Sequence, residues 1–227
     1  GLIIFNEHDP LRFDAADVVD FLHVAEQWFA RTQQAHPEAV FPFLSWNCLE
    51  KAAASQLHGH LQVILSAGLH QAQAERWRQA ASAYAQWVAV ERSVSGGGME
   101  RYFADFVAAH ECLGLTRCSG DCQVLAHLTP IKEREVVIVG TPGTRELSTA
   151  LAHVLRTFVE RCGVTCFNVG IVYPPRVAEA RWAGFPIVAR VVDRGPTGSG
   201  TVDIGGMELY GTPVVSADPY DVIAALG

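Results

Sequence analysis

The chain has 227 residues, of which 49% are apolar and only 18% are charged. This composition, with a mean hydropathy of +0.16, excludes an intrinsically disordered chain. The net charge of -7 argues against a general nucleic-acid or anionic-membrane surface. No stretch approaches the roughly 20 apolar residues of a membrane span, and no signal peptide opens the chain. We therefore expect a globular protein that binds neither nucleic acid nor membrane.

The cysteine pattern favours reduced thiols over a metal site or a disulfide framework. The six cysteines form no CxxC pair, and they lie at positions 48, 112, 118, 122, 162 and 166. A structural zinc site needs closer pairs, and a chain of this length without a secretory signal rarely depends on disulfides. We expect a cytoplasmic location.

The first half of the chain combines strands with long helices. An apolar segment follows Gly1 directly, so we expect a further segment before it. Asp14 is a suitable N-cap for a helix whose apolar positions recur at helical spacing. The expected elements are a strand at 2–5, a helix at 15–34, an antiparallel pair of strands at 41–46 and 57–65, and a helix at 69–92.

The second half repeats this mixture with little sequence identity. The glycine-rich stretch 93–99 reads as the boundary between the halves, which we place at 1–95 and 96–227. The expected elements are helices at 100–110, 147–161 and 218–226, and strands at 112–117, 122–129, 135–140, 165–175 and 186–195. The pattern predicts an α+β fold in which two pseudo-repeated halves contribute antiparallel sheet flanked by helices.

The segment LHGHLQVIL carries its polar residues, His58, His60 and Gln62, at alternate positions. In a strand such positions share one face, and three neutral polar groups there suit a site that holds an anion. Two other interpretations stay open. The strand can simply face solvent, or the two histidines can bind zinc, although no third ligand lies nearby in the sequence.

The segment WNCLEKAAASQLHGHLQ resembles the active-site segment of the galactose-1-phosphate uridylyltransferases, which belong to the histidine-triad-like superfamily. The family pattern is an Asn, a run of small residues, a Ser, and then His-x-His-x-Gln. Asn47 and Ser55 lie eleven and three residues before His58, as in that pattern. Ala-Ser-Gln at 54–56 looks like the variant of the related dinucleoside-polyphosphate phosphorylases. The stretches FNVGIVYPP (167–175) and DIGGMEL (203–209) resemble second-half segments more weakly.

The resemblance implies a two-step transfer through a nucleotidyl-histidine, with His60 as nucleophile. Imidazole titrates near neutral pH and is then a good nucleophile. In the family, the backbone carbonyl of the first histidine, here His58, accepts a hydrogen bond from the other ring nitrogen. Gln62 would donate to a phosphoryl oxygen. Because an amide cannot shuttle a proton as the third histidine of the hydrolases does, Gln62 favours a phosphate acceptor over water.

The resemblance also implies that Asn47, Ser55 and Gln56 contact the nucleotide or its phosphates. Its substrates would be a nucleotide sugar with a sugar 1-phosphate. The alternatives are a dinucleoside-polyphosphate or nucleotide-sugar phosphorylase that uses inorganic phosphate, and a degenerate module that binds nucleotides without turnover. The family often dimerises, so the resemblance allows a homodimer.

The chain departs from the family pattern at several positions. Leu57 and Gly59 replace the prolines around the first histidine, and Leu49 replaces a glycine. The second-half histidines that bind a metal in the family are replaced at Gly170 and Val172 or their neighbours. Zinc occurs in the family, but because its ligands are mostly absent here we expect no metal and no other cofactor.

Overall fold

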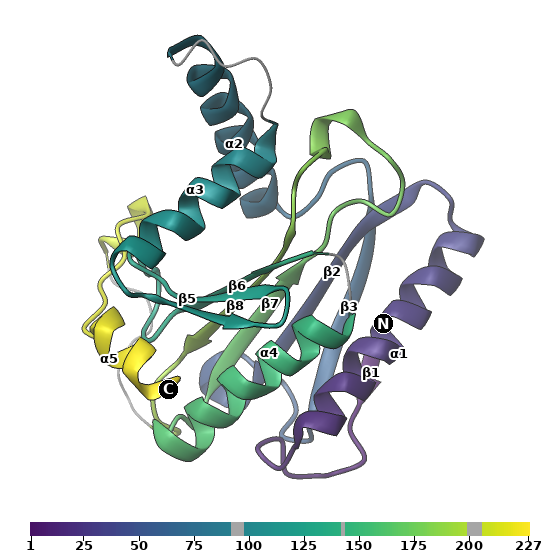
Figure 1. Cartoon of the computed structure of the whole chain (residues 1–227). Helices are drawn as coiled ribbons and strands as arrows, with labels where there is room; N and C mark the ends of the chain where they lie inside the picture. Colours follow the sequence, from purple (N-terminus) through teal and green to yellow (C-terminus); the bar gives the residue numbers. More distant parts are fainter. Residues whose placement is uncertain (92–97, 142–143, 199–205) are drawn as a thin grey trace.

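The computed structural model describes residues 1–91, 98–141, 144–198 and 206–227 (Figure 1). The expected boundary between residues 95 and 96 lies outside the described residues, as do positions 203–205 of the DIGGMEL segment.

Eight antiparallel strands form one sheet that runs through both halves of the chain. The strands are β1 (Leu2–Ile4), β2 (Ala39–Cys48), β3 (His60–Ala67), β4 (Thr116–Ser119), β5 (Cys122–Ala126), β6 (Val136–Gly140), β7 (Phe167–Val172) and β8 (Ile187–Asp193). Their order is β1-β3-β2-β7-β8-β6-β5-β4, in which the first-half order β1-β3-β2 recurs in reverse as β7-β8-β6. The expected α+β class is confirmed, and the halves join where β2 pairs with β7.

Five helices flank the sheet: α1 (Ala15–Ala35), α2 (Ala72–Glu91), α3 (Met99–Cys112), α4 (Thr144–Arg156) and α5 (Pro219–Ala225). The start of α1 is capped as the sequence predicts. The Asp14 carboxylate accepts hydrogen bonds from the Ala16 and Asp17 amides, and the Asp17 carboxylate accepts one from the Asp14 amide. None of the described helices is long and apolar enough to cross a bilayer.

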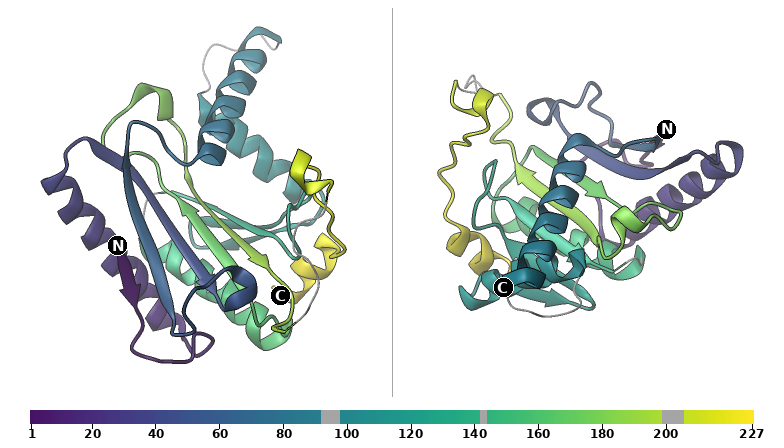
Figure 2. Two further views of the ribbon diagram at one scale, coloured as in Figure 1. Left: turned by 180° about the vertical axis from the view of Figure 1, so that it is seen from behind. Right: turned by 90° about the horizontal axis from the view of Figure 1, so that it is seen from above.

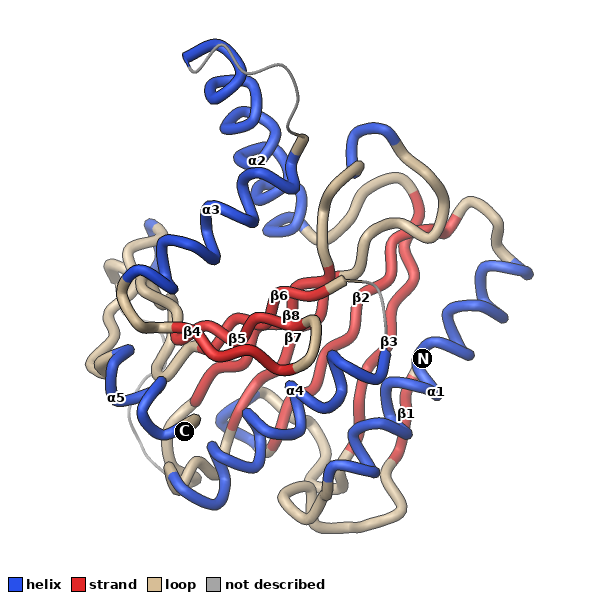
Figure 3. Tube along the Cα trace, in the orientation of Figure 1, coloured by secondary structure: helices blue, strands red, loops and turns tan. Residues whose placement is uncertain are grey.

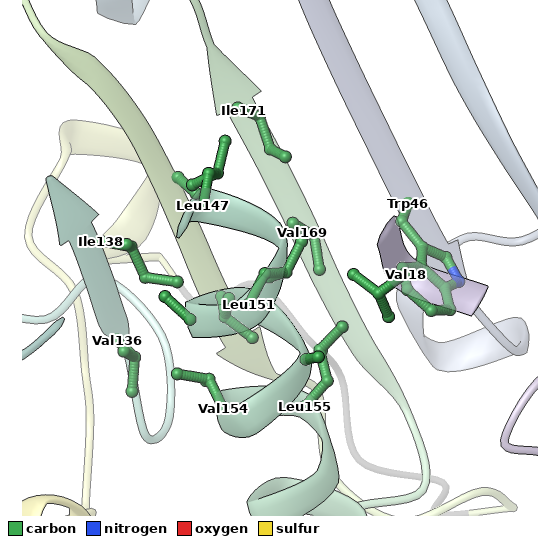
Figure 4. Close-up of a cluster of buried hydrophobic side chains, with 14 of the residues drawn as sticks. Val18, Trp46, Val136, Ile138, Leu147, Leu151, Val154, Leu155, Val169 and Ile171 are labelled. Carbon is green, nitrogen blue, oxygen red and sulfur yellow. The ribbon is translucent and has the colours of Figure 1, made fainter. Parts of the chain in front are cut away.

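Helices α1 and α4 pack against each other and cover one face of the sheet. Figure 4 shows this core, where Leu151 and Leu155 of α4 meet Val169 of β7, and Val18 of α1 packs near Trp46 of β2. Alternate residues of the central strands enter this core because strand side chains alternate between faces.

The opposite face is covered over only part of its width. Helix α3 and the turn at Ala180–Trp182 bury a second cluster there, in which Phe103 and Trp182 accompany Val137 and Val188 of the sheet. In the rear view no described helix crosses β3 and β2 on this side (Figure 2, left), and the tube in Figure 3 shows α2 and α3 gathered near the β4–β6 end of the sheet. We call this exposed part of β3, β2 and β7 the open face.

Two strands start later than the sequence predicts. Helix α3 continues through Cys112 and ends at a left-handed glycine, Gly114 with φ 71°, so that β4 starts at Thr116. Strand β3 starts at His60 rather than at Leu57.

Candidate functional site

Strand β3 presents His60 and Gln62 on the open face. Leu61 and Val63, which alternate with them, are buried in the core under α1. In the sheet, Gln62 lies opposite Ser45 of β2, and Ser45 lies opposite Gly170 of β7. The motif therefore begins a row of polar or small residues that runs across the junction of the two halves.

The ring of His60 is oriented by its own backbone segment. Its Nδ1 lies 2.9 Å from the carbonyl oxygen of His58. A carbonyl oxygen only accepts, so Nδ1 carries the proton and donates, and Nε2 holds the lone pair. This is the hydrogen bond that the resemblance implies.

The expectation that His58 belongs to the same strand as His60 and Gln62 is wrong. Because β3 begins only at His60, the His58 side chain turns toward the segment after β1. Its Nε2 donates to the Phe5 carbonyl at 2.8 Å, and its Nδ1 lies 3.0 Å from Nδ1 of His8. The side chain of His58 therefore contacts Phe5 and His8, and the backbone carbonyl of His58 is the group that bonds to His60.

Gly59 separates the two histidines because no larger residue fits. A Cβ atom at this position would lie 2.2 Å from Cδ2 of Phe5. The Phe5 ring is itself fixed, stacked on Phe21 at a centroid distance of 3.9 Å and edge-on to Trp46 at 5.1 Å. The glycine that replaces a family proline is thus explained by close contact with this aromatic cluster.

Asn47 lies in a network of side-chain amides on the open face. Its Oδ1 accepts from the Ser45 hydroxyl at 3.3 Å and from Nδ2 of Asn168 at 2.7 Å. Asn168 is opposite Asn47 in the β2–β7 register. Sequence reasoning missed both Ser45 and Asn168. The available signals were a second polar residue besides Asn47 in β2 and a single polar residue in β7.

Arg194, just after β8, brings a positive charge to the same network. Its Nη1 donates to Oδ1 of Asn168, and its backbone amide bonds to the Cys166 carbonyl at 2.9 Å. Burial lowers the pKa of Arg194, partly offset by the nearby Cys166 and Glu208. A guanidinium nevertheless stays charged in proteins.

The loop between β2 and β3 is strained and anchored. Leu49 has φ 65° and ψ 176°, a region used almost only by glycine. Its carbonyl accepts from the Ala52 and Ala54 amides, and Asn168 Nδ2 donates to the Ala52 carbonyl at 2.8 Å. The family glycine that Leu49 replaces therefore corresponds to a real backbone requirement.

Ser55 and Gln56 lie farther along this loop, and both are exposed. Neither side chain makes a hydrogen bond within the described part of the chain. The structure does not bring them into the network around Asn47.

The residues near His58 do not fit a zinc site by themselves. His8 and His58 offer two nitrogens, but no group of three or more His, Cys, Asp or Glu residues suited to a metal occurs among the described residues. A structural zinc site needs four ligands. No metal is therefore assigned a part in the chemistry.

The candidate site is a face rather than an enclosed cavity. A cavity of about 530 Å³ lies between β1 and α1, lined by residues such as Phe5, Asp20 and Phe21. Its lining does not include His60 or Gln62. A ligand at His60 would lie on the open face.

Several solved structures share the fold of this chain. A uridylyltransferase superposes with a TM-score of 0.74 over 97% of this chain and 70% of its own length, at 13% identity. The fold is that of the uridylyltransferases. The same fold occurs in an ADP-glucose phosphorylase from Arabidopsis thaliana with bound ADP-glucose (TM-score 0.72, 14% identity, 99% of this chain and 71% of that chain).

A DUF4931 family protein from Bacillus cereus also shares the uridylyltransferase fold (TM-score 0.60, 13% identity, 99% of this chain and 86% of that chain). No protein-family model and no curated protein sequence matches the chain. At these identities the likeness shows the uridylyltransferase fold alone.

Proposed function

We propose that the chain transfers a nucleotidyl group from a nucleoside diphosphate sugar to a phosphate-bearing acceptor, through a covalent intermediate on His60. The observation that carries this proposal is the 2.9 Å hydrogen bond from Nδ1 of His60 to the His58 carbonyl. It fixes the tautomer in which Nε2 has the lone pair, on a face that no described helix covers. The uridylyltransferase fold supports the proposal.

In the first step, Nε2 of His60 attacks the α-phosphorus and a new N–P bond forms. The bond between this phosphorus and the bridging oxygen breaks, and the sugar 1-phosphate leaves with that electron pair. The ring becomes positively charged in the adduct, and the His58 carbonyl stabilises the remaining N–H. In the second step an acceptor phosphate attacks, the N–P bond breaks, and neutral His60 is restored.

Gln62 and Asn47 are the proposed donors to the phosphoryl oxygens, where negative charge develops. Both belong to strands rather than loops, so their positions are set by the sheet. Ser55 and Gln56 remain proposed contacts that require movement of the exposed loop.

The acceptor is proposed to be a sugar 1-phosphate, with inorganic phosphate as the second candidate. The second candidate is favoured by the fold shared with an ADP-glucose phosphorylase. The experiment supplies UDP-glucose or ADP-glucose with either acceptor and follows the nucleotide products. Transfer to galactose 1-phosphate supports the transferase, release of nucleoside diphosphate with inorganic phosphate supports the phosphorylase, and no transfer in any arm contradicts both.

A module that binds nucleotides without turnover is the remaining candidate. The feature in its favour is strand β7, where Gly170 and Val172 stand at or near the positions that the resemblance assigns to the family's metal-binding histidines. Calorimetric binding of UDP or ADP, with no covalent label in the wild type, would support it. We also propose a cytoplasmic location and a homodimer. Size-exclusion chromatography with light scattering tests the homodimer.

A further inference from the structure

A row of hydrogen bonds joins the two halves of the chain on the open face. It runs from the Arg194 guanidinium to Oδ1 of Asn168, and from Nδ2 of Asn168 to Oδ1 of Asn47 at 2.7 Å. The Ser45 hydroxyl donates to the same Asn47 oxygen at 3.3 Å. Ser45 and Asn47 belong to β2, and Asn168 lies opposite Asn47 on β7. These three residues of the row are therefore positioned by the sheet.

The direction of every bond in this row is fixed by two groups whose roles are unambiguous. The Arg194 guanidinium has only donors, so the Asn168 atom that meets it is the oxygen. The Ala52 carbonyl only accepts, so the Asn168 atom 2.8 Å away is the nitrogen. This nitrogen also faces Asn47, and the Asn47 atom that receives it is therefore the oxygen.

The Asn47 carboxamide is consequently held in one orientation. Its oxygen accepts from Asn168 and Ser45, and its Nδ2 group makes no hydrogen bond within the described part of the chain. The β2–β3 register pairs Ser45 with Gln62, so Asn47 lies on β2 two residues beyond this pair, and His60 lies on β3 two residues before it. A reversed carboxamide would present an oxygen to the phosphate and repel it.

We propose that Asn168 is a positioning residue for the nucleotidyl-transfer site, which it serves by holding the Asn47 amide with its N–H group toward the phosphate. This inference rests on the proposed function. It assigns a task to the second half of the chain, which supplies both Asn168 and the charge of Arg194 that polarises it. Asn168 does not itself touch the substrate.

The test is a double-mutant cycle on Asn47 and Asn168, with UDP and ADP as probes measured by calorimetry. Asn168→Ala weakens the binding of either nucleotide about tenfold, because a hydrogen bond to a charged phosphate is lost or misaligned. In the Asn47→Ala background the same change alters the affinity less than twofold. Residues that act through one another are non-additive in this way, whereas independent structural effects add.

Asn168→Asp gives a second, directional readout. The aspartate can still accept a hydrogen bond from Arg194, but it has no N–H group to donate to Asn47. The Asn47 carboxamide then rotates so that its own N–H group faces the aspartate. Its nucleotide affinity falls at least as far as that of Asn168→Ala. The matched control is Thr165→Ala, which removes a hydrogen-bonding side chain just before β7 and leaves affinity unchanged. Thermal unfolding with each variant identifies any that does not fold.

The outcomes separate this inference from the proposed function. Additive losses in the cycle, an unaltered affinity in Asn168→Asp, or no nucleotide binding by the wild type would each overturn the role of Asn168. Nucleotide binding with a non-additive cycle, but without a covalent label on His60, would uphold it and contradict the proposed catalytic function.

Discussion

Nδ1 of His60 is bound to the backbone carbonyl of His58 at 2.9 Å, so the proposed nucleophile is oriented by the peptide group two residues before it. A backbone acceptor cannot rotate away as a carboxylate side chain can. The orientation of His60 therefore depends on the path of the chain through Gly59, and this path depends on the packing of Phe5.

Gly59→Ala is expected to destabilise the protein and to misplace His60. The new methyl group would lie 2.2 Å from the Phe5 ring, which is stacked on Phe21 and edge-on to Trp46 and would have to shift from both contacts. Overpacking of this kind costs about 1–3 kcal/mol. Urea unfolding measures the loss, and nucleotide labelling measures the effect on His60.

Gly206→Ala is the matched control, because a Cβ atom there meets nothing within 4 Å. Equal free energies of unfolding for Gly59→Ala and Gly206→Ala would show that the Phe5 contact does not constrain the motif.

Gln62→His is expected to divert the intermediate to water. An imidazole at this position of the open face can take a proton from an attacking water, which the amide cannot. The rate of nucleoside monophosphate release in the absence of acceptor should rise at least tenfold, while the rate of label formation changes little. Gln62→Ala, which lacks both groups, should not show the increase. Equal hydrolysis by the histidine and alanine variants would refute this role for Gln62.

His70 is expected to make the protein less stable as the pH falls below about 6.5. Its Nε2 donates to the Tyr173 carbonyl at 3.0 Å, and its Nδ1 accepts from the Gln71 amide at 2.8 Å, an arrangement that requires the neutral ring. Burial lowers the pKa of His70, against weaker raising effects of the Tyr173 hydrogen bond and Glu75.

As the pH falls below about 6.5, His70 is therefore protonated more readily in the unfolded chain than in the folded chain. Stability is constant above this pH and is lost below it, by at most about 1.4 kcal/mol per pH unit for one histidine. His110, whose pKa is also lowered chiefly by burial, adds a loss of the same sign.

Urea unfolding between pH 7.5 and 5.5 measures this slope. His70→Asn should be less stable at pH 7.5 but lose less on acidification, and the exposed His36→Asn should keep the wild-type slope. An unchanged slope in His70→Asn would assign the acid sensitivity to other groups.

The local elements were predictable because their signals are local. The apolar spacing after Asp14 and its capping pattern predicted α1, and the alternation after His60 predicted β3. The pairing of β2 with β7, which joins Asn47 to Asn168 across 121 residues, carries no such signal. It is accompanied by the packing of α1 against α4, another contact between segments far apart in the sequence.

The candidate site was likewise predictable only where its residues lie close together in the sequence. His60, Gln62 and Asn47 were proposed as site residues because the motif places them within a short segment. The alternation did not place the His58 side chain, because it predicts a shared face only within a strand, and β3 starts two residues later. Asn168 was missed because a single polar residue in an apolar strand is not a motif.

The most direct test of the central claim is the mass of the intact protein after incubation with UDP-glucose or ADP-glucose, followed by mapping of the modified peptide. The wild type should gain one nucleotidyl group, labile to acid and stable to alkali, on the peptide that contains His60, and His60→Asn should gain none. A wild type that binds nucleotide without this gain, or an adduct that persists in His60→Asn, would contradict the account.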